Sequence, residues 1–212
     1  MDTDYKNLLP DILRFKPEKK MLEILGFNSC IYLTKDPEQM ESFEDGIFPA
    51  FLIECSDSKS LKRDLKIAKS GWIVGVKAGE TSVLREAISR RKVDIILDFP
   101  GSRVDYISMK MAAEKDVIME ISMRRFFDTK GSRRMREFEQ VLNMINVSRK
   151  FSSPIVFTSG AGEFVEMRHT RQLREFFEYL GGDFQKSLNS LRRLIRRYFD
   201  ETYLMDGLEV IS

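Results

Sequence analysis

The sequence predicts an α/β protein whose parallel strands form a TIM-like (β/α) barrel. Short apolar runs alternate with amphipathic helical patterns at least six times, and each strand-plus-helix unit takes roughly 20 to 25 residues. This number of units favours a barrel over an open sheet. A chain of 212 residues with 42% hydrophobic residues can bury one substantial core, so we expect a single domain over residues 1–212.

One complete βαβ unit is visible between Arg90 and Phe127. Residues 93–97 form a β-branched run typical of a strand covered on both faces, which ends at Asp98 and Pro100-Gly101. A helix is expected from Asp105 and a second strand over 117–121. The apolar positions of that helix are Ile107, Met109, Met111, Ala112 and Ala113. A right-handed crossover places loops 98–103 and 122–125 at the carboxyl edge of the sheet, where functional residues of α/β folds collect. This edge would carry Asp98, Arg103, Arg124 and Arg125.

The first half of the chain gives less regular signals. Residues 1–16 form a short apolar segment interrupted by Pro10, with no clear strand. Pro17 suits a first helical turn and Gly26 a helix stop, so a helix is predicted between them. The other elements expected here are strands over 29–33, 48–54 and 72–76, a connection over 35–46, and helices that begin at 56–60 and after Gly79.

Two amphipathic helices stand out in the second half. The helix over 133–151 is expected to bury one stripe, because apolar residues recur at i, i+3, i+4 and i+7. That stripe consists of Phe138, Val141, Leu142 and Ile145. A strand over 154–157 and a helix from Thr170 to about Leu180 follow.

The last helix, at about 184–199, is long, basic and amphipathic. Its apolar stripe is Phe184, Leu188, Leu191, Ile195 and Phe199. Its basic flank is Arg192, Arg193, Arg196 and Arg197. That flank is either the solvated face of a core helix or a surface that binds RNA or a partner.

Basic and acidic residues nearly cancel over the whole chain, at 35 and 33. Residues 61–136, however, hold 18 basic against 10 acidic residues, so this middle third would face a polyanion if it is not simply solvated. Cys30 and Cys55 form no CxxC pair and are expected to be free, buried thiols in a reducing compartment. The acidic start, residues 1–4, resembles no signal peptide, and no run is long enough to span a bilayer. We therefore expect a cytoplasmic protein without membrane contact.

The chemical groups of the sequence argue against a hydrolytic site. Metal-dependent hydrolases built on barrels use several histidine ligands, and His169 is the only histidine. No GxSxG elbow accompanies it, and one histidine beside Arg168 is more often a surface or loop residue. The amides of residues 159–162 could hold a phosphate or form only a tight turn. The phosphate alternative gains weight from Arg168, Arg171 and Arg174, which follow soon after.

Three segments, 93–122, 154–161 and 167–199, resemble protein component 3 of archaeal ribonuclease P, a family related to the eukaryotic thirty-kilodalton subunit. The resemblance covers about the second half of the chain well. It implies a TIM-like barrel that is related to metal phosphoesterase-type barrels but lacks their metal ligands. The motif positions of the family fall here on Asp94, Asp105, Glu120, Ser159, Gly160 and Ala161.

The same resemblance implies a role in tRNA processing. Proteins of this family bind the ribonuclease P RNA together with a component 2 partner and other ribonuclease P proteins, and they support removal of the 5′ leader from precursor tRNA. Catalysis in the family belongs to the RNA and its bound Mg²⁺. No catalytic residue, metal ligand or cofactor is therefore expected in this chain. The alternatives are a metal-dependent phosphoesterase of the related barrel superfamily and a non-catalytic scaffold unconnected to RNA.

Arginines are the expected RNA contacts, because a guanidinium can hold a phosphate through two hydrogen bonds. Arginines that follow strands or begin helices would gather on one rim of a barrel. We expect RNA contacts at Arg103, Arg124, Arg125, Arg168 and Arg171, and a second set on the last helix at Arg192, Arg193 and Arg196.

Overall fold

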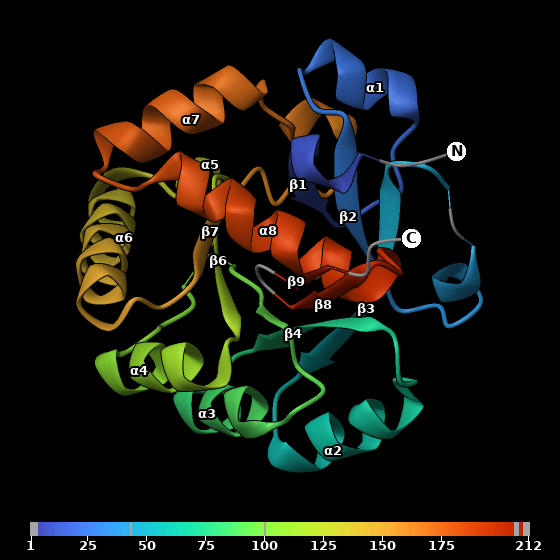
Figure 1. Ribbon diagram of the computed structural model, residues 1–212. Coiled ribbons are helices and arrows are strands. Elements are labelled where there is room, and N and C mark those ends of the chain that lie inside the picture. Colours follow the sequence, from blue (N-terminus) through green and yellow to red (C-terminus); the bar gives the residue numbers. More distant parts are fainter. Residues whose placement is uncertain (1–3, 43, 100, 206–207, 210–212) are drawn as a thin grey trace.

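Seven parallel strands form a nearly closed, TIM-like barrel, which confirms the predicted fold class. The structure is a computed structural model that describes residues 4–42, 44–99, 101–205 and 208–209. Neighbouring strands pair in chain order, from β1 at one edge to β7 at the other, and helices surround them (Figure 1). The strands are β1 Pro10–Leu13, β2 Ser29–Thr34, β3 Ile47–Cys55, β4 Ile73–Ala78, β5 Ile95–Ile96, β6 Ile118–Ser122 and β7 Ile155–Thr158.

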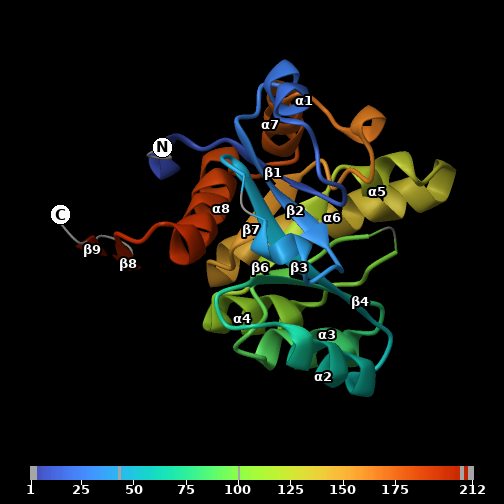
Figure 2. The same ribbon diagram turned by 90° about the vertical axis from the view of Figure 1, so that its right-hand side faces the viewer.

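The helices lie outside the strands, except that the last one, α8, runs across one end of the barrel (Figures 1 and 2). The helices are α1 Lys19–Ile24, α2 Ser58–Ile67, α3 Thr81–Ser89, α4 Tyr106–Lys115, α5 Arg124–Phe127, α6 Gly131–Phe151, α7 Thr170–Tyr179 and α8 Phe184–Phe199. Short 3₁₀ turns occupy Tyr5–Asn7, Gln39–Glu41 and Phe164–Glu166, and an antiparallel hairpin, β8 Tyr203–Met205 with β9 Leu208–Glu209, follows α8.

The reading of residues 1–16 as having no clear strand is wrong, because Pro10–Leu13 pairs in parallel with β2. Proline is tolerated as the first residue of a strand. Asp11 interrupts the apolar pattern, yet it is buried because its carboxylate accepts hydrogen bonds from the amide and hydroxyl of Ser159. A strand of 4 residues with a buried carboxylate carries little periodic signal.

Side chains close the seam between the two edge strands of the barrel. No ladder joins β1 to β7 in the part of the chain that the structure describes. The contact of Asp11 with Ser159 bridges the seam on one side, and Phe157 N donates to Ser187 Oγ of α8 over 2.9 Å on the other. A buried amide of an edge strand needs such a partner, so α8 takes part in closing the barrel wall.

Apolar side chains pack in two layers, one inside the barrel and one between the sheet and the outer helices. Leu191, Leu194 and Ile195 of α8 close the inner layer at one end. The inner layer also contains Leu97, directly after β5, and the strand residues Ile12, Ile31, Leu33, Phe48, Ala50, Ile73, Ile95, Ile118 and Val156. The predicted apolar stripe of the last helix is confirmed, since its first four members are buried and Phe199 packs against Phe48, with ring centroids 5.0 Å apart.

Two other helices bury faces that differ from the predicted ones. Leu142 of α6 is 40% exposed, whereas Glu137 is buried because Arg125 binds its carboxylate. In α4, Ile107 is 50% exposed. The side chains that α4 buries are Ser108, Met109 and Ala112.

Cys30 and Cys55 are free and buried, as predicted, and burial raises the pKa of both thiols, that of Cys55 to about 11. No helix of the described chain is long and apolar enough to cross a membrane. Pro100 and residues 1–3, on which two of the sequence arguments rely, lie outside the described residues.

Candidate nucleic-acid interface

The arginines expected to bind RNA lie on three parts of the fold. The loops that follow the strands form the carboxyl end of the barrel, at the right of Figure 2, and α8 covers the amino end at the left. Arg103, Arg124 and Arg125 follow strands at the carboxyl end, Arg168 and Arg171 flank the start of α7, and Arg192, Arg193 and Arg196 lie on α8.

The Arg125 side chain cannot contact a phosphate of RNA, because it is 0% exposed. Its guanidinium pairs with Asp98 at 3.3 Å and with Glu137 at 2.9 Å, and its Nη2 donates to the Ser102 carbonyl over 3.3 Å. The expected RNA contact at Arg125 is therefore corrected to a structural role. This side chain fastens α5 to α6 and to the loop after β5.

Two buried carboxylates at the carboxyl mouth of the barrel are each held by an arginine. Glu120 pairs with Arg14 and also accepts from Thr158 Oγ1 over 2.7 Å. Asp98 pairs with Arg125, and its amide donates to Glu120 over 2.9 Å. Burial raises the pKa of Asp98 to about 6, although the Arg125 guanidinium acts in the opposite direction.

These ion pairs determine which ligands the carboxyl mouth of the barrel can bind. A cavity of about 290 Å³ opens here, and Arg14, Asp98 and Arg124 are among its lining residues. Within the described residues, no group of three or more His, Cys, Asp or Glu side chains could hold a metal ion. Because guanidinium groups already occupy Asp98 and Glu120, this set of carboxylates does not fit an open metal site.

The loop after β7 forms a tight turn that serves the barrel seam. Ser159 is fixed by Asp11, and Gly160 adopts a φ of +60° at a point where a side chain would overlap Ser122. Gly162 N donates to a glutamate in the same loop over 2.6 Å. Two of the amides that could have held a phosphate, those of Ser159 and Gly162, are thus bound to carboxylates of the protein itself, and the amide of Ala161 donates to Ser159 Oγ.

The remaining motif positions of the resemblance also have structural partners. Ala161 is buried, and its carbonyl accepts from Arg14 N over 2.8 Å. Asp105 begins α4, accepts from Ser108 N over 2.9 Å and pairs with Arg85. These contacts hold loops in place at the carboxyl end.

Asp94 lies at the other end of β5, away from the carboxyl mouth. Its carboxylate accepts from Val74 N over 2.9 Å and from the Tyr198 hydroxyl of α8 over 2.8 Å. Burial raises the pKa of Asp94 to about 6. This motif residue therefore helps to seat α8 on the barrel.

Arg124 and Arg168 reach the surface but are engaged within the chain. The Arg124 side chain is 38% exposed and pairs with Asp128 at 3.0 Å and with Glu166 at 3.3 Å. The Arg168 guanidinium lies over the Phe127 ring, 4.3 Å from its centroid. Either arginine could reach a phosphate only in competition with these contacts.

Arg103 and Arg171 are more accessible. Arg171 is 79% exposed and pairs with Glu175 at 2.7 Å. Arg103 is exposed and has no ion pair or hydrogen bond with any residue that the structure describes. His169 is exposed in a loop, as predicted, and its Nδ1 accepts from Arg171 N at the start of α7.

The arginines of α8 bind the protein itself. Arg193 and Arg197 both pair with Asp116 at the end of α4, at 2.5 and 2.6 Å. Arg196 pairs with Asp200 at 2.9 Å. The two pairs with Asp116 fasten α8 to the barrel, a role that the sequence did not indicate, whereas the pair of Arg196 lies within the last turn of α8.

Arg192 is directed toward the N-terminal segment, where its Nε donates to the Leu8 carbonyl over 2.7 Å. Burial lowers the pKa of this guanidinium. The flank of α8 thus holds the helix in position on the barrel.

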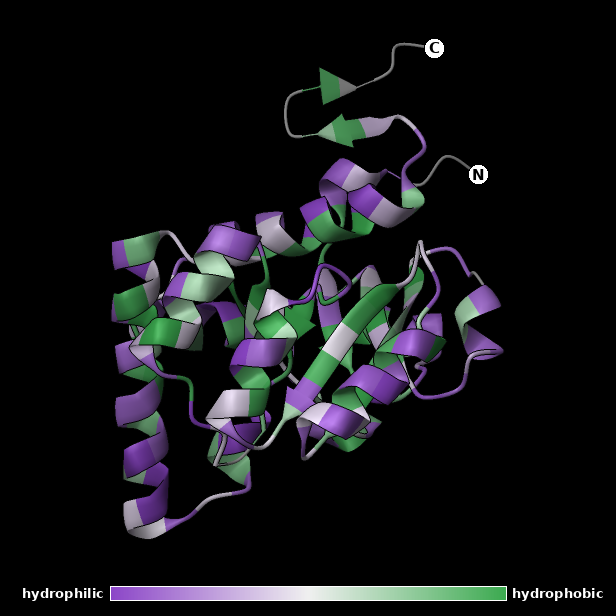
Figure 3. Ribbon diagram, turned by 90° about the horizontal axis from the view of Figure 1, so that it is seen from below, coloured by the Kyte–Doolittle hydropathy of each residue, from purple (hydrophilic) through white to green (hydrophobic). Residues whose placement is uncertain are grey.

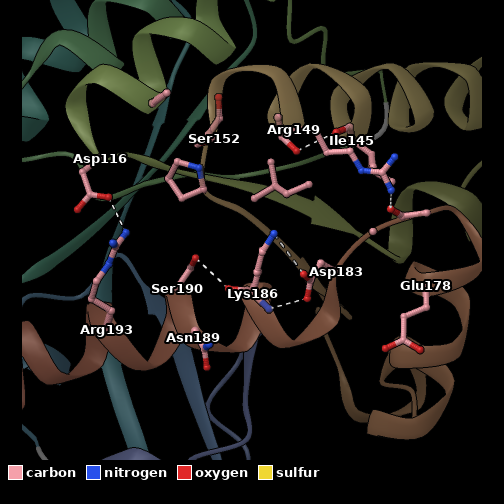
Figure 4. Close-up of a pocket in the computed structure, with 17 residues that line it drawn as sticks. Asp116, Ile145, Arg149, Ser152, Glu178, Asp183, Lys186, Asn189, Ser190 and Arg193 are labelled. Atoms are coloured by element: carbon pink, nitrogen blue, oxygen red, sulfur yellow. Dashed lines mark hydrogen bonds and ion pairs between the residues drawn. The ribbon is translucent and has the colours of Figure 1, made fainter. Parts of the chain in front are cut away.

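A groove of about 970 Å³ lies beside α8, between the ends of α4, α6 and α7 (Figure 4). Lys186 and Asp183 approach each other on one wall, and the pair of Arg193 with Asp116 lies at the other end. Acidic and basic groups alternate along the groove, so it favours neither anions nor cations.

The structure also exposes a basic cluster that the sequence analysis did not single out. Lys130, Arg133, Arg134 and Arg136 are exposed at the start of α6. The available signal was the density of basic residues in 130–136, which contains no acidic residue. In the sequence this run also reads as an ordinary helix start, which does not by itself indicate a binding surface.

Comparisons with known proteins agree with the geometry of the barrel. The family model described as RNase P subunit p30 matches residues 47–202. The chain is 39% identical over 200 residues to "Ribonuclease P protein component 3" of Archaeoglobus fulgidus, which covers 94% of each chain. It is 27% identical over 170 residues to the protein of that name from Methanosarcina mazei, covering 76% of this chain and 71% of the relative.

A solved structure is similar over nearly the whole length. One chain in the "cryo-EM structure of archaeal Ribonuclease P with mature tRNA" aligns with a TM-score of 0.74 and 19% identity, over 96% of this chain and 98% of that chain. At this identity the similarity concerns the fold.

Proposed function

Because this chain belongs to the RNase P subunit p30 family, we propose that it is a protein subunit of ribonuclease P. In this role it binds the ribonuclease P RNA and supports removal of the 5′ leader from precursor tRNA in the cytoplasm. The observation that carries the proposal is the 39% identity to a component 3 protein, spread over 94% of both chains. Similarity of that extent includes the loops as well as the barrel.

The chain itself has no catalytic residue in this proposal. The RNA and its Mg²⁺ perform the cleavage, and the protein positions the RNA. In support, the mouth carboxylates Asp98 and Glu120 are bound by Arg125 and Arg14, which leaves no open carboxylate set for a phosphoesterase metal. Purified chain should therefore cleave neither precursor tRNA nor a model phosphodiester in Mg²⁺ or Mn²⁺. Cleavage that disappears in Asp98→Asn would support the phosphoesterase alternative instead.

The chain acts together with a component 2 protein and the other ribonuclease P proteins. RNA contacts in the proposal come from the accessible members of the expected set, Arg103, Arg124, Arg168 and Arg171. Exposure supports this choice, since a phosphate contact requires a guanidinium that solvent can reach.

The test is reconstitution of the holoenzyme from its RNA, the component 2 protein, the remaining subunits and this chain. Cleavage of precursor tRNA should depend on the chain. Combining Arg103→Ala, Arg124→Ala and Arg168→Ala should weaken RNA binding and lower the slope of log K against log salt by about 0.9 for each lost phosphate contact. Unchanged cleavage when the chain is omitted would contradict the proposal and favour a scaffold unconnected to RNA.

A further inference from the structure

The joint between α5 and α6 presents a dense group of accessible cations at the carboxyl end. We call residues 127–136 the α5–α6 elbow. Lys130, Arg133, Arg134 and Arg136 are exposed there, and Phe127 and Met135 beside them are 45% and 61% exposed. In Figure 2 the start of α6 projects at the right beyond the strands, and Figure 3 shows it as a hydrophilic tip far from α8.

Most arginines elsewhere in the described chain pair with a carboxylate, whereas the four cations of the elbow do not. Within the described residues, Lys130, Arg133, Arg134 and Arg136 form no ion pair, although Arg134 Nε donates to the Thr129 carbonyl over 2.8 Å. The carboxylates of the adjoining turns neutralise little of this positive charge. Asp128 is exposed but binds Arg124, and Glu137 is buried against Arg125. Glu139 is exposed and forms no ion pair within the described residues.

Contacts with the rest of the protein hold the backbone of the elbow in place. Thr129 Oγ1 donates to the Arg125 carbonyl over 2.8 Å, and Arg125 holds α6 through Glu137. The rings of Phe126 and Phe138 pack with centroids 4.6 Å apart beneath it. Because these contacts hold the backbone in place, binding requires the cationic side chains to become ordered but not the backbone, which removes one of the usual costs of association.

The surface continues toward the loop after β5. A side chain at Gly101 would lie 3.7 Å from Arg133 Nη2, so Arg133 lies beside the loop that carries Arg103. Arg103, which has no described partner, extends the same positive surface. A set of unneutralised cations on a rigid, projecting tip is complementary to a polyanion.

We propose that the α5–α6 elbow binds the phosphate backbone of structured RNA, as a contact separate from the engaged arginines at the barrel mouth. This inference rests on the proposed function and names the surface on which RNA binding depends most. Three arginines favour phosphate over isolated carboxylates, because their planar groups bind phosphate oxygens in pairs. The exposed apolar side chains of Phe127 and Met135 can cover sugars beside that backbone.

The experiment measures binding of a fluorescein-labelled RNA duplex of arbitrary sequence to the full-length chain at several salt concentrations. The elbow variant combines Lys130→Gln, Arg133→Gln, Arg134→Gln and Arg136→Gln. A control that removes the same charge from exposed residues scattered over α2, the turn after α3, and α4 combines Lys59→Gln, Lys66→Gln, Arg91→Gln and Lys115→Gln. Two half variants, Arg133→Gln with Arg134→Gln and Lys130→Gln with Arg136→Gln, keep the test informative if the full variant folds poorly.

The elbow variant should bind at least about tenfold more weakly, and its salt slope should fall by about 0.9 for each lost contact, whereas the control should retain most of the slope of the natural sequence. Equal slopes for the elbow variant and the control would overturn the inference. If the elbow variant keeps its slope while alanine at Arg124 and Arg168 loses it, the proposed function stands and the elbow assignment is wrong. If the natural chain binds the duplex without salt dependence, both are wrong. Competition by polyglutamate as strong as that by unlabelled duplex would mean that the elbow binds an acidic protein.

Discussion

The two ends of the barrel both present arginines, but they use them differently. On α8, Arg193 and Arg197 share Asp116, and Arg196 pairs with Asp200. At the α5–α6 elbow, Arg133 and Arg136 have no ion pair within the described chain. The basic face of α8 therefore binds carboxylates of the same protein, whereas the cations of the α5–α6 elbow remain available to an external anion.

The same contrast exists between neighbours in sequence at the carboxyl end. Arg124 is partly exposed and Arg125 fully buried, although both follow β6. Arg125 pairs with two buried carboxylates, Asp98 and Glu137. The two carboxylates that pair with Arg124 are partly exposed. Counting arginines consequently identifies neither the RNA surface nor the structural ion pairs. The two groups differ in whether a carboxylate of the protein already neutralises each arginine.

The buried Arg125 should contribute far more to stability than its neighbour Arg124. Arg125→Ala should destabilise the fold by about 3–5 kcal/mol, because it leaves two buried carboxylates without their cation. Arg124→Ala should cost about 1 kcal/mol or less, as is usual for exposed pairs. Urea unfolding followed by circular dichroism measures both. Similar urea midpoints for the two variants would show that Arg125 does not hold the elbow in place.

The next effect concerns how α8 closes the barrel. Leu191 is 1% exposed in the inner layer, so Leu191→Ala should cost roughly 2–5 kcal/mol. Arg193→Ala removes a partly exposed ion pair and should cost about 1 kcal/mol or less. The urea midpoints of the two variants give the comparison. Equal losses would mean that the arginines of α8 contribute to folding as much as its apolar stripe.

A third prediction uses pH at the seat of α8. Burial raises the pKa of Asp94 to about 6 from 3.8, so ionisation destabilises the folded state as pH rises between about 4 and 6. Asn cannot ionise, and its amide can keep hydrogen bonds to Val74 and Tyr198. Relative to the natural chain, Asp94→Asn should therefore gain about 2–3 kcal/mol over this pH range.

The control for the pH prediction has the opposite sign. Asp57 caps α2, and hydrogen bonds from the amides of Ser60 and Lys59 lower the pKa of its carboxyl group. Asp57→Asn should therefore lose stability relative to the natural chain as pH rises. Urea titrations at several pH values measure both variants, and the same sign for both would contradict the environment assigned to Asp94.

The sequence predicted the elements whose signal is local. The repeated strand-helix period indicated the barrel, and the spacing of Phe184, Leu188 and Leu191 indicated the buried face of α8. It did not reveal β1, because Pro10 and Asp11 interrupt the apolar pattern of that strand. The hydrogen-bond partner of the buried Asp11 carboxylate, Ser159, lies far away in the sequence. Long-range partners have no local pattern, and the site predictions failed at Arg125 for the same reason.

Single surface arginines at the two ends of the barrel should change stability only slightly, but by different amounts. Arg197→Gln removes a pair with Asp116 in which both side chains are partly exposed, so it should cost about 0.2–1 kcal/mol. Arg133→Gln removes no ion pair and relieves repulsion from neighbouring cations, so stability should stay within about 0.5 kcal/mol or rise slightly. High salt should shrink the cost of Arg197→Gln because it screens the exposed pair. Thermal unfolding at low and high salt measures these differences. A larger loss for Arg133→Gln than for Arg197→Gln would mean that Arg133 has a partner within the protein, and the elbow would then lose its distinction from α8.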